Sequence, residues 1–450
     1  MRLKKIKIGK YKNLSNFECE FSNSNISAFI GNNGSGKSNL LEVITEVFSI
    51  AKKVCEDKHY KIIVPPDIYG CEIEYEKEGV FYVLKYDNPT VSVYQNNKKL
   101  VKREMSAALP ESIMIYYAGE TLRQARVATE TFDEKYDNRL KKSDNNTFPG
   151  YKYIDYYSSD DLGLLLLTAA VYKGEYYEKV LSLLRCDRIL PEINIMLQNP
   201  KGKEQENADM YWGAKGFVQS FLDELRKYVS STQNLLAFYS MSFLDIEPFK
   251  NVAKNESEFF AKLKAVKNAG YLHWIRLEMC TKNGEKFTFD MLSEGEKQLL
   301  LLYLLTTFTA KDNCLYIFDE FDAYLHLNWQ RLFSQMINET QVNGHILFTT
   351  HSPASISKIQ RKDVYKMANG KVSKPLSDTF NRSLDEVMEE QLGVSLRPKE
   401  YTELVCEFRN AIMHNDRNLA LSKIEQIREI VGEEDPFFIT ATIALERMKS

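Results

Sequence analysis

The stretch at residues 31–38, GNNGSGKS, constrains this chain more than any other. It follows an apolar run at residues 26–30 and precedes a helical pattern at residues 39–44. Strand, glycine-rich turn, lysine and hydroxyl, then helix is the Walker A arrangement, in which backbone N–H groups converge on phosphate oxygens at a helix N-terminus. The sequence therefore predicts a phosphate-binding loop. The residues expected to contact a nucleotide are Asn32, Asn33, Gly34, Ser35, Gly36, Lys37, Ser38 and Asn39.

Within this loop two side chains have distinct expected roles. Lys37 is expected to reach the β- and γ-phosphates, and Ser38 is expected to ligate Mg²⁺. ATP and Mg²⁺ are therefore the expected ligands.

Three further motifs lie in the second half of the chain. Residues 292–298, LSEGEKQ, open an apolar helix. The apolar strand at residues 314–318 ends in Asp319 and Glu320, a Walker B pattern that puts carboxylates where ligands bind in open α/β sheets. A later strand at residues 346–350 leads into His351.

Composition bounds the class of protein. A chain of 450 residues is long for one core, so two or three domains are expected. The net charge of -3 disfavours a strongly basic nucleic-acid binder, although basic clusters at residues 2–12 and 135–142 are compatible with a local DNA-binding face.

Seven scattered cysteines indicate reduced thiols. No apolar run reaches the roughly 18 residues that span a bilayer, so we expect a cytoplasmic bacterial protein without membrane contact.

The order of patterns predicts four segments. Residues 1–120 contain strand patterns, including an antiparallel meander at 60–95, and form the first part of a head. Residues 121–272 are expected to form an inserted helical lobe, and residues 273–375 the second part of the head. Residues 376–450 are expected to be a helical region for oligomer or partner contacts. The helical patterns are at 162–172, 175–184, 214–228, 256–266, 383–391, 399–413 and 419–431.

Taken together, the motifs resemble the ABC-type ATPase head shared by transporters, the SMC and Rad-fifty proteins, RecF and the OLD-like ATPases. The resemblance implies an α/β fold, a P-loop ATPase head with mixed and antiparallel sheets and flanking helices. Residues 292–298 match the family's signature motif, with Glu294 in place of the commoner glycine and Glu296 in place of the commoner glutamine. The family's Q-loop glutamine has no clear match, and a role for Gln124 is in doubt. The resemblance does not extend to the insertion.

The resemblance also implies roles within one head. Asp319 would hold the Mg²⁺ shell, Glu320 would orient or deprotonate the attacking water, and His351 would sense the γ-phosphate. Lys12 occupies a place where related soluble heads have a phosphate-contacting Arg or Lys.

Other implied roles act between two heads that sandwich two ATP molecules. Ser293, Glu294 and Gly295 lie at a helix N-terminus, where Ser293 and Gly295 would contact the γ-phosphate bound by the other protomer. Asp322 would lie in the D-loop, which crosses the dimer interface. A homo-oligomer formed through the heads is therefore expected.

A narrower likeness involves residues 117–120 (YAGE), 319–326 (DEFDAYLH), 349–353 (TTHSP) and 381–384 (NRSL). Together they look like bacterial anti-phage ATPases, in particular the ATPase subunit of the Septu defence system (PtuA). That family works with a separate HNH nuclease subunit, so the resemblance implies such a partner, with any DNA contact made through the complex. The chain itself carries no H-N-H or Toprim pattern.

The resulting hypothesis is an ATP-binding and hydrolysing regulatory subunit that controls a separate nuclease. One alternative is a RecF- or SMC-like DNA-repair ATPase, for which we expect DNA-stimulated turnover without a partner. Another is a nucleotide-gated scaffold that binds ATP and barely hydrolyses it. A transporter subunit is disfavoured because neither a membrane segment nor a coupling region is evident.

Overall fold

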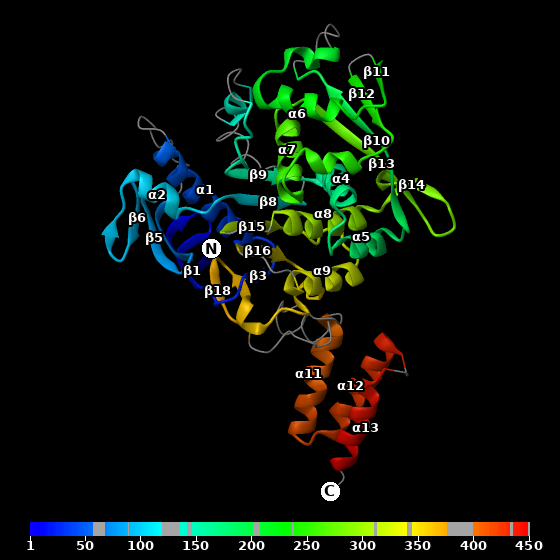
Figure 1. The fold of residues 1–450 in the computed structure, drawn as a ribbon. Helices are drawn as coiled ribbons and strands as arrows, with labels where there is room; N and C mark the ends of the chain where they lie inside the picture. The colour runs from blue at the N-terminus through cyan, green and yellow to red at the C-terminus, as the bar shows by residue number, and fades with distance from the viewer. Residues whose placement is uncertain are drawn as a thin grey trace. The chain divides into compact units, whose positions relative to one another are not determined.

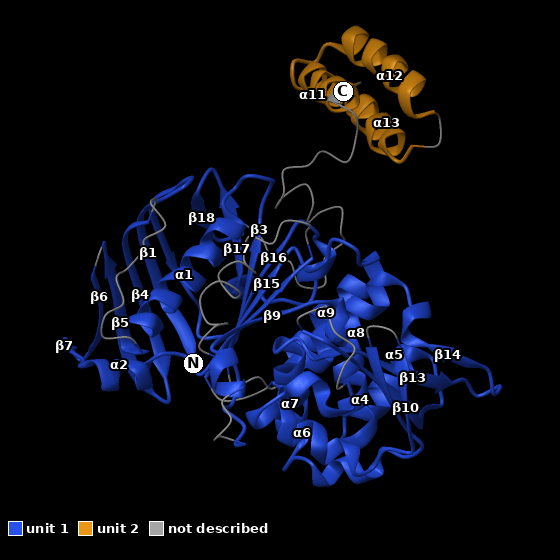
Figure 2. Cartoon of the chain, turned by 90° about the horizontal axis from the view of Figure 1, so that it is seen from above, with its two compact units in different colours: residues 1–381 blue, residues 382–450 orange. Residues whose placement is uncertain are grey.

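The computed structural model describes residues 1–56, 68–88, 90–118, 136–141, 146–200, 208–235, 238–309, 313–339, 344–375, 399–432 and 435–448. The chain forms two compact units, Met1–Asn381 and Arg382–Ser450 (Figure 2). Several sequence features fall partly or wholly outside the described residues: the start of the meander predicted at 60–95, residues 119–120 of the YAGE stretch, Gln124, the NRSL stretch at 381–384 and the helix predicted at 383–391.

The first unit begins with an antiparallel sheet, ordered β2-β1-β4-β5-β6-β7 (Figure 1). The two N-terminal strands pair, and the meander that the sequence predicts follows. Its inward side chains pack on helix α1, Lys37–Glu56, in one shared core. The strands are β1 (Arg2–Tyr11), β2 (Leu14–Glu20), β4 (Tyr69–Lys77), β5 (Val80–Asp87), β6 (Thr90–Gln95) and β7 (Lys98–Lys99), and the short helix α2 (Lys102–Ala108) follows.

A second sheet, ordered β18-β17-β3-β16-β15-β8-β9, packs on the other side of the same core. All neighbours are parallel except β17 and β18. The carboxyl ends of β3, β16 and β15 therefore lie side by side, and the loops that follow them carry Walker A, His351 and Walker B. The strands are β3 (Ile26–Ile30), β8 (Ile113–Tyr117), β9 (Ile154–Tyr157), β15 (Cys314–Asp319), β16 (Gly344–Thr350), β17 (Val364–Ala368) and β18 (Lys371–Ser373).

The inserted lobe contains a five-stranded antiparallel sheet, β11-β12-β10-β13-β14, beside its helices (Figure 1). The prediction of a helical lobe did not include this sheet. Period-two alternation is weak in these strands: β10 contains Pro191, and β11 is the polar stretch STQNL. The elements are α4 (Leu162–Tyr172), α5 (Tyr177–Leu184), β10 (Arg188–Gln198), α6 (Gly216–Arg226), β11 (Ser231–Leu235), β12 (Phe238–Phe243), α7 (Glu256–Asn268), β13 (Leu272–Cys280) and β14 (Lys286–Thr288).

The strand pairing also places both ends of the lobe differently from the predicted boundaries at residues 121 and 272. Strands β13 and β14 form a hairpin at the start of the segment assigned to the head, but β13 pairs with β10 inside the lobe and not with the head sheet. Conversely, β9 lies inside the segment assigned to the lobe and pairs with β8 of the head. Local alternation indicates that a strand exists without identifying its neighbour.

Helix α8, Glu294–Phe308, packs against the helices of the lobe, and helix α9, Leu327–Glu339, packs against α8. Helix α8 begins at the signature motif and leads to β15; helix α9 follows the Walker B loop. Both pack with their neighbours through buried faces: Leu300, Leu301 and Leu304 of α8 are at most 1% exposed. Within the described residues, no helix is long and apolar enough to cross a membrane.

The second unit contains three helices, α11 (Lys399–Met413), α12 (Arg417–Val431) and α13 (Phe437–Arg447). The first two were predicted, whereas α13 was not. The three helices share a small core that includes Phe408, Ala420, Ile427 and Ala441. Asp416 caps α12 by accepting a hydrogen bond from the N–H of Leu419, 3.0 Å away.

Distant parts of the chain are joined at His345. The N–H of Leu3 donates to His345 Nδ1 at 3.0 Å, so Nε2 carries the proton and donates to the Ser27 hydroxyl at 2.9 Å. The imidazole is fully buried, and this burial lowers the pKa of His345 to about 3. Two residues before Leu3, the Met1 ammonium group donates a hydrogen bond to the side chain of Asn313.

We therefore expect acid to destabilise the head through His345. Below pH 6.5 the unfolded chain binds a proton there that the native state does not bind, until the pH approaches the folded pKa of about 3. The free energy of unfolding should fall by up to about 1.4 kcal/mol per pH unit across this window. Urea titrations at pH 7.5 and 5.5 should show a smaller pH effect in His345→Gln than in the wild type. The matched control is His414→Gln in the exposed end of the other unit; an equal pH effect in His345→Gln would contradict the assignment.

Candidate nucleotide-binding site

The Walker A loop connects β3 to α1 in a conformation that depends on close backbone approach. Gly31 has φ of 154°, and a Cβ at this position would lie 2.2 Å from the carbonyl oxygen of Met367 in β17. A side chain at residue 31 would therefore force β17 away from the loop. The N–H of Ser35 donates to the carbonyl of Asn32 at 3.2 Å, which closes the turn before the helix begins.

Two residues that sequence reasoning missed hold this loop. The Asn13 side chain donates to the Gly34 carbonyl at 2.7 Å and accepts from Asn39 Nδ2 at 2.8 Å. From the β17–β18 turn, the Gly370 N–H donates to the carbonyl of Ser35 at 3.0 Å. The turn that contains Gly370 is far from the loop in sequence, and the turn that contains Asn13 carries no recognisable motif. The available signal for Asn13 was an amide side chain in a tight turn.

A cavity of about 310 Å³ opens over the loop. Its walls are Walker A residues 33–39 together with Glu320 and His351. The Lys37 side chain is buried and its ammonium donates to the carbonyls of Gly31, at 2.9 Å, and Asn32. Burial lowers the pKa of Lys37 to about 8, against the opposing effect of nearby carboxylates. Three motifs separated by up to 318 residues in sequence thus meet around one hollow, because their strands are neighbours in the sheet.

Asp319 lies behind this cavity, at the end of β15. Its Oδ1 accepts hydrogen bonds from the hydroxyls of Ser38, at 3.1 Å, and Thr349. Burial raises the pKa of Asp319 to about 6, and these two hydrogen bonds oppose the rise. The Thr349 hydroxyl also accepts the backbone N–H of Glu320 at 2.9 Å, so one side chain of β16 fixes both acidic residues. The sequence did not single out Thr349 for this role.

Glu320 and His351 face the cavity from adjacent loops. Glu320 has φ of 50°, in the left-handed region that non-glycine residues seldom adopt. Burial, followed by the Lys37 charge, lowers the pKa of His351 to about 4. The imidazole is therefore neutral at pH 7 and can donate or accept a hydrogen bond without contributing charge.

Lys12 does not line this cavity. Its ammonium pairs with the carboxylate of Glu42, on α1, at 2.5 Å and lies 4.8 Å from the ring centre of Tyr11. The predicted phosphate contact of Lys12 would require this pair to separate.

The signature motif forms the start of α8, away from the residues that line the cavity of its own chain. Ser293 is exposed and caps the helix: its hydroxyl accepts the N–H of Glu296, whose carboxylate in turn accepts the N–H of Ser293 at 2.9 Å. Glu296, where the family more often has glutamine, thus completes a capping box. Glu294 is exposed and pairs with Lys297 at 2.8 Å. Gly295 is buried, and a Cβ there would lie 3.1 Å from the Tyr324 carbonyl.

Asp322 is held by hydrogen bonds within its own chain. Its carboxylate is 7% exposed and accepts hydrogen bonds from the hydroxyls of Thr350 and Ser355 in the same chain. Burial raises its pKa, and these hydrogen bonds oppose the rise. Two internal hydroxyls thus hold this side chain inside its own head, and the place of its loop at a dimer interface stays a prediction. In the same loop, Tyr324 is 58% exposed.

Comparisons with known proteins show the family of this chain. Residues 2–374 match the family model described as RecF/RecN/SMC N terminal domain. The chain belongs to this family. It is 23% identical to "Retron Vc95 probable ATPase" of Vibrio cholerae serotype O1 biovar El Tor, over 94% of this chain and 86% of that protein. It is 27% identical to "Retron Ec83 probable ATPase" of Escherichia coli, over 29% of this chain and 24% of that protein.

Among solved structures, this RecF/RecN/SMC-type chain is similar to an SMC head domain from Thermotoga maritima. The sequence identity is 13% and the TM-score is 0.36, over 83% of this chain and 98% of that one. It is also similar to an SmcHead crystallised with the C-winged helix domain of ScpA, at 14% identity and a TM-score of 0.38, over 86% of this chain and 100% of that one.

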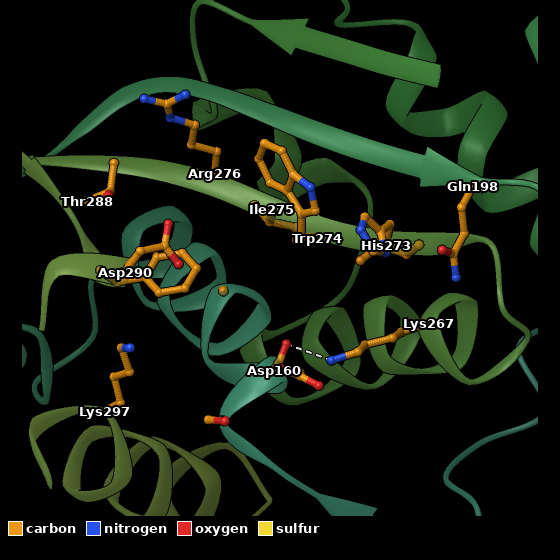
Figure 3. Close-up of a pocket in the computed structure, with 14 residues that line it drawn as sticks. Asp160, Gln198, Lys267, His273, Trp274, Ile275, Arg276, Thr288, Asp290 and Lys297 are labelled. Atoms are coloured by element: carbon orange, nitrogen blue, oxygen red, sulfur yellow. Dashed lines mark hydrogen bonds between the residues drawn. The ribbon is translucent and has the colours of Figure 1, made fainter. Parts of the chain in front are cut away.

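A larger hollow, of about 800 Å³, lies in the lobe of this family member (Figure 3). Figure 3 shows β13 along it, with Lys297 and Asp290 toward one end and Gln198 toward the other. Its lysines already have partners: Lys267 donates to the Asp160 carbonyl at 2.6 Å, and Lys297 pairs with Glu294. It lacks the glycine-rich backbone of the smaller cavity, which is therefore the better phosphate site.

The residues around the smaller cavity fit ATP with Mg²⁺. The hydroxyl of Ser35 is buried without a hydrogen-bond partner among the described residues. This is expected of a hydroxyl that donates to a phosphate oxygen when the nucleotide is bound. Lys37 is held by two carbonyls that a phosphate can replace as its partner. Ser38 and Asp319 present a hydroxyl and a carboxylate side by side, the hard oxygen ligands that Mg²⁺ prefers.

Proposed function

We propose that this chain is the ATP-binding and hydrolysing regulatory subunit of a bacterial anti-phage defence complex, and that it controls a separate HNH-type nuclease. The observation that carries the ATPase part is the cavity in which Walker A, Glu320 and His351 meet, with Asp319 bonded to Ser38 behind it. Similarity to two proteins named as retron probable ATPases supports a defence role. The nuclease partner rests on the resemblance to the Septu ATPase subunit.

Each side chain around the cavity has a distinct role in the proposed reaction. Lys37, the loop N–H groups and the Ser35 hydroxyl bind the phosphates, while Ser38 and Asp319 hold Mg²⁺. Bound Mg²⁺ would neutralise charge on the phosphate oxygens. The Glu320 carboxylate orients a water molecule and accepts its proton as the water oxygen bonds to the γ-phosphorus and the bond to the β-phosphate oxygen breaks. Neutral His351 donates a hydrogen bond to the γ-phosphate.

Oligomerisation through the heads is the second part of the proposal. Ser293 is exposed at the positive end of α8, where its hydroxyl and the neighbouring N–H groups suit a phosphate held by a second copy of the chain. ATP would then join two heads, and hydrolysis would release them and change what the lobes present to the nuclease.

The first test is the mass of the purified chain with and without ATP and Mg²⁺, alone and together with any copurifying protein. The proposal expects an ATP-dependent change of assembly, ATP turnover, and a copurifying nuclease. A chain that stays alone, binds duplex DNA with ATP-dependent affinity and is stimulated by that DNA would instead support the repair ATPase that the RecF/RecN/SMC match keeps open.

Substitution of Ser293 tests the contact between heads. We expect Ser293→Arg to bind ATP as a monomer, yet to lose ATP-dependent assembly and at least about tenfold of its turnover, because a long cation blocks the approach of the second head. Ser293→Ala is the matched control, since it removes the helix cap at a cost of about 1 kcal/mol without adding bulk. Wild-type assembly and turnover in Ser293→Arg would count against head closure through this motif.

A further inference from the structure

Gln330 of α9 has a buried side chain that joins two loops of the head. It is 7% exposed. Its Nε2 donates to the Leu325 carbonyl at 2.8 Å and to the Asp322 carbonyl at 3.3 Å, both in the loop that follows Glu320. Its Oε1 accepts the hydroxyl of Ser352, the residue after His351. One carboxamide therefore binds the loops that carry the two side chains facing the cavity.

A second link between the same loops closes a polar ring. The Thr350 hydroxyl donates to the Asp322 carboxylate and accepts the Ser352 N–H at 2.8 Å. The ring thus runs from Asp322 through Thr350 and Ser352 to Gln330, and back to Asp322. A carboxamide suits this position because it supplies two N–H donors for carbonyls and one oxygen for a hydroxyl. A carboxylate lacks the donors, and an apolar side chain lacks both.

The conformation of Glu320 makes such a brace necessary. Its φ of 50° is strained for a residue with a side chain, and strain of this kind persists only where the surroundings over-determine the backbone. The turn after it is closed by the Ala323 N–H donating to the Glu320 carbonyl at 3.1 Å. Gln330 holds the far end of that turn at the carbonyls of Asp322 and Leu325.

We infer that Gln330 is a positioning residue for ATP hydrolysis: through the Asp322 and Ser352 ring it fixes the Glu320 loop relative to the His351 loop, so that both side chains meet the γ-phosphate together. This inference rests on the proposed function. Gln330 touches neither the nucleotide loop nor the cavity, so its effect falls on the rate of the chemical step and not on nucleotide affinity.

The test compares Gln330→Ala and Gln330→Met, the second of which nearly preserves side-chain volume, in the full chain. We expect kcat to fall by about 10- to 100-fold, while the Kd for a fluorescent ATP analogue changes by less than about threefold. Gln335→Ala is the matched control, because Gln335 lies on the same helix but is exposed and bonds Glu339. It should turn over ATP at the wild-type rate.

A cycle with Ser352→Ala separates positioning from general loss of structure. If Gln330 acts through Ser352, the double variant should lose far less than the product of the two single losses. Lowered melting temperature with unchanged kcat in the folded fraction would show a merely structural role and overturn the inference. So would wild-type kcat in both Gln330 variants. Absence of turnover in the wild-type chain would instead overturn the proposed ATPase function, and the positioning role with it.

Discussion

Glu320→Gln is expected to reduce ATP hydrolysis by about 100-fold or more and to leave ATP affinity within about threefold of the wild type. Glutamine keeps the shape of the side chain but accepts no proton from water. The backbone stays in place, because the Glu320 N–H still bonds the Thr349 hydroxyl. Since hydrolysis would release the heads, the variant should also prolong the ATP-dependent assembly.

The measurement is phosphate release over time, together with assembly mass in ATP. Glu339→Gln is the matched control: it also neutralises a carboxylate, but one that is exposed on α9 and paired with Lys179. Wild-type turnover in Glu320→Gln would exclude Glu320 as the base. If Glu320→Gln also left the biological function intact, the nucleotide-gated scaffold would be the better description.

Lys37→Ala is expected to weaken ATP binding by about 100-fold or more, because it removes a buried charge that would lie against two phosphates. Without nucleotide the variant should melt close to the wild-type temperature, since burying the ammonium is itself unfavourable, as the lowered pKa of Lys37 indicates. In thermal melts with increasing ATP, the melting temperature of the wild type should therefore rise, while that of the variant should stay unchanged.

Lys12→Ala provides the informative comparison for this experiment. Lys12 is engaged with Glu42 and lies outside the cavity, so we expect an affinity change of less than about threefold. A loss comparable with that of Lys37→Ala would restore the phosphate contact first predicted for Lys12. ATP affinity unchanged in Lys37→Ala would contradict the site itself.

The sequence predicted those parts of the fold whose signal is local. Walker A has a glycine pattern fixed by backbone geometry, and residues 314–318 are a continuous apolar run, as a strand buried on both faces requires. The lobe sheet was missed because its strands have no such signal: β11 is polar and exposed along most of its length, and its pairing depends on β12. Assignment of β9 to the wrong segment has the same origin, since its partner β8 is far away in sequence.

The candidate site shows the same division. The motif residues Lys37, Glu320 and His351 could be named because each follows a recognisable strand. Their supports were missed, because Asn13, Thr349 and Gln330 act through hydrogen bonds that form only after separate loops have come together. The burial of Asp322 could not be predicted either: its motif is recognisable, but only the folded head supplies the hydroxyls that bury its carboxylate.

The joint at His345 has a consequence for synthesis on the ribosome. Strand β3 pairs with β16, and the Ser27–His345 hydrogen bond connects residues 318 positions apart. At translation rates of about 5–20 residues per second, β3 is made roughly 15–60 seconds before its neighbour exists. During that interval the phosphate-binding loop has been synthesised but lacks Asp319, Thr349 and His351. The nascent chain thus carries the glycine-rich motif long before it can hold a nucleotide, and β3, whose partners are β16 and β17, must be kept from misassembly until the second half of the head arrives.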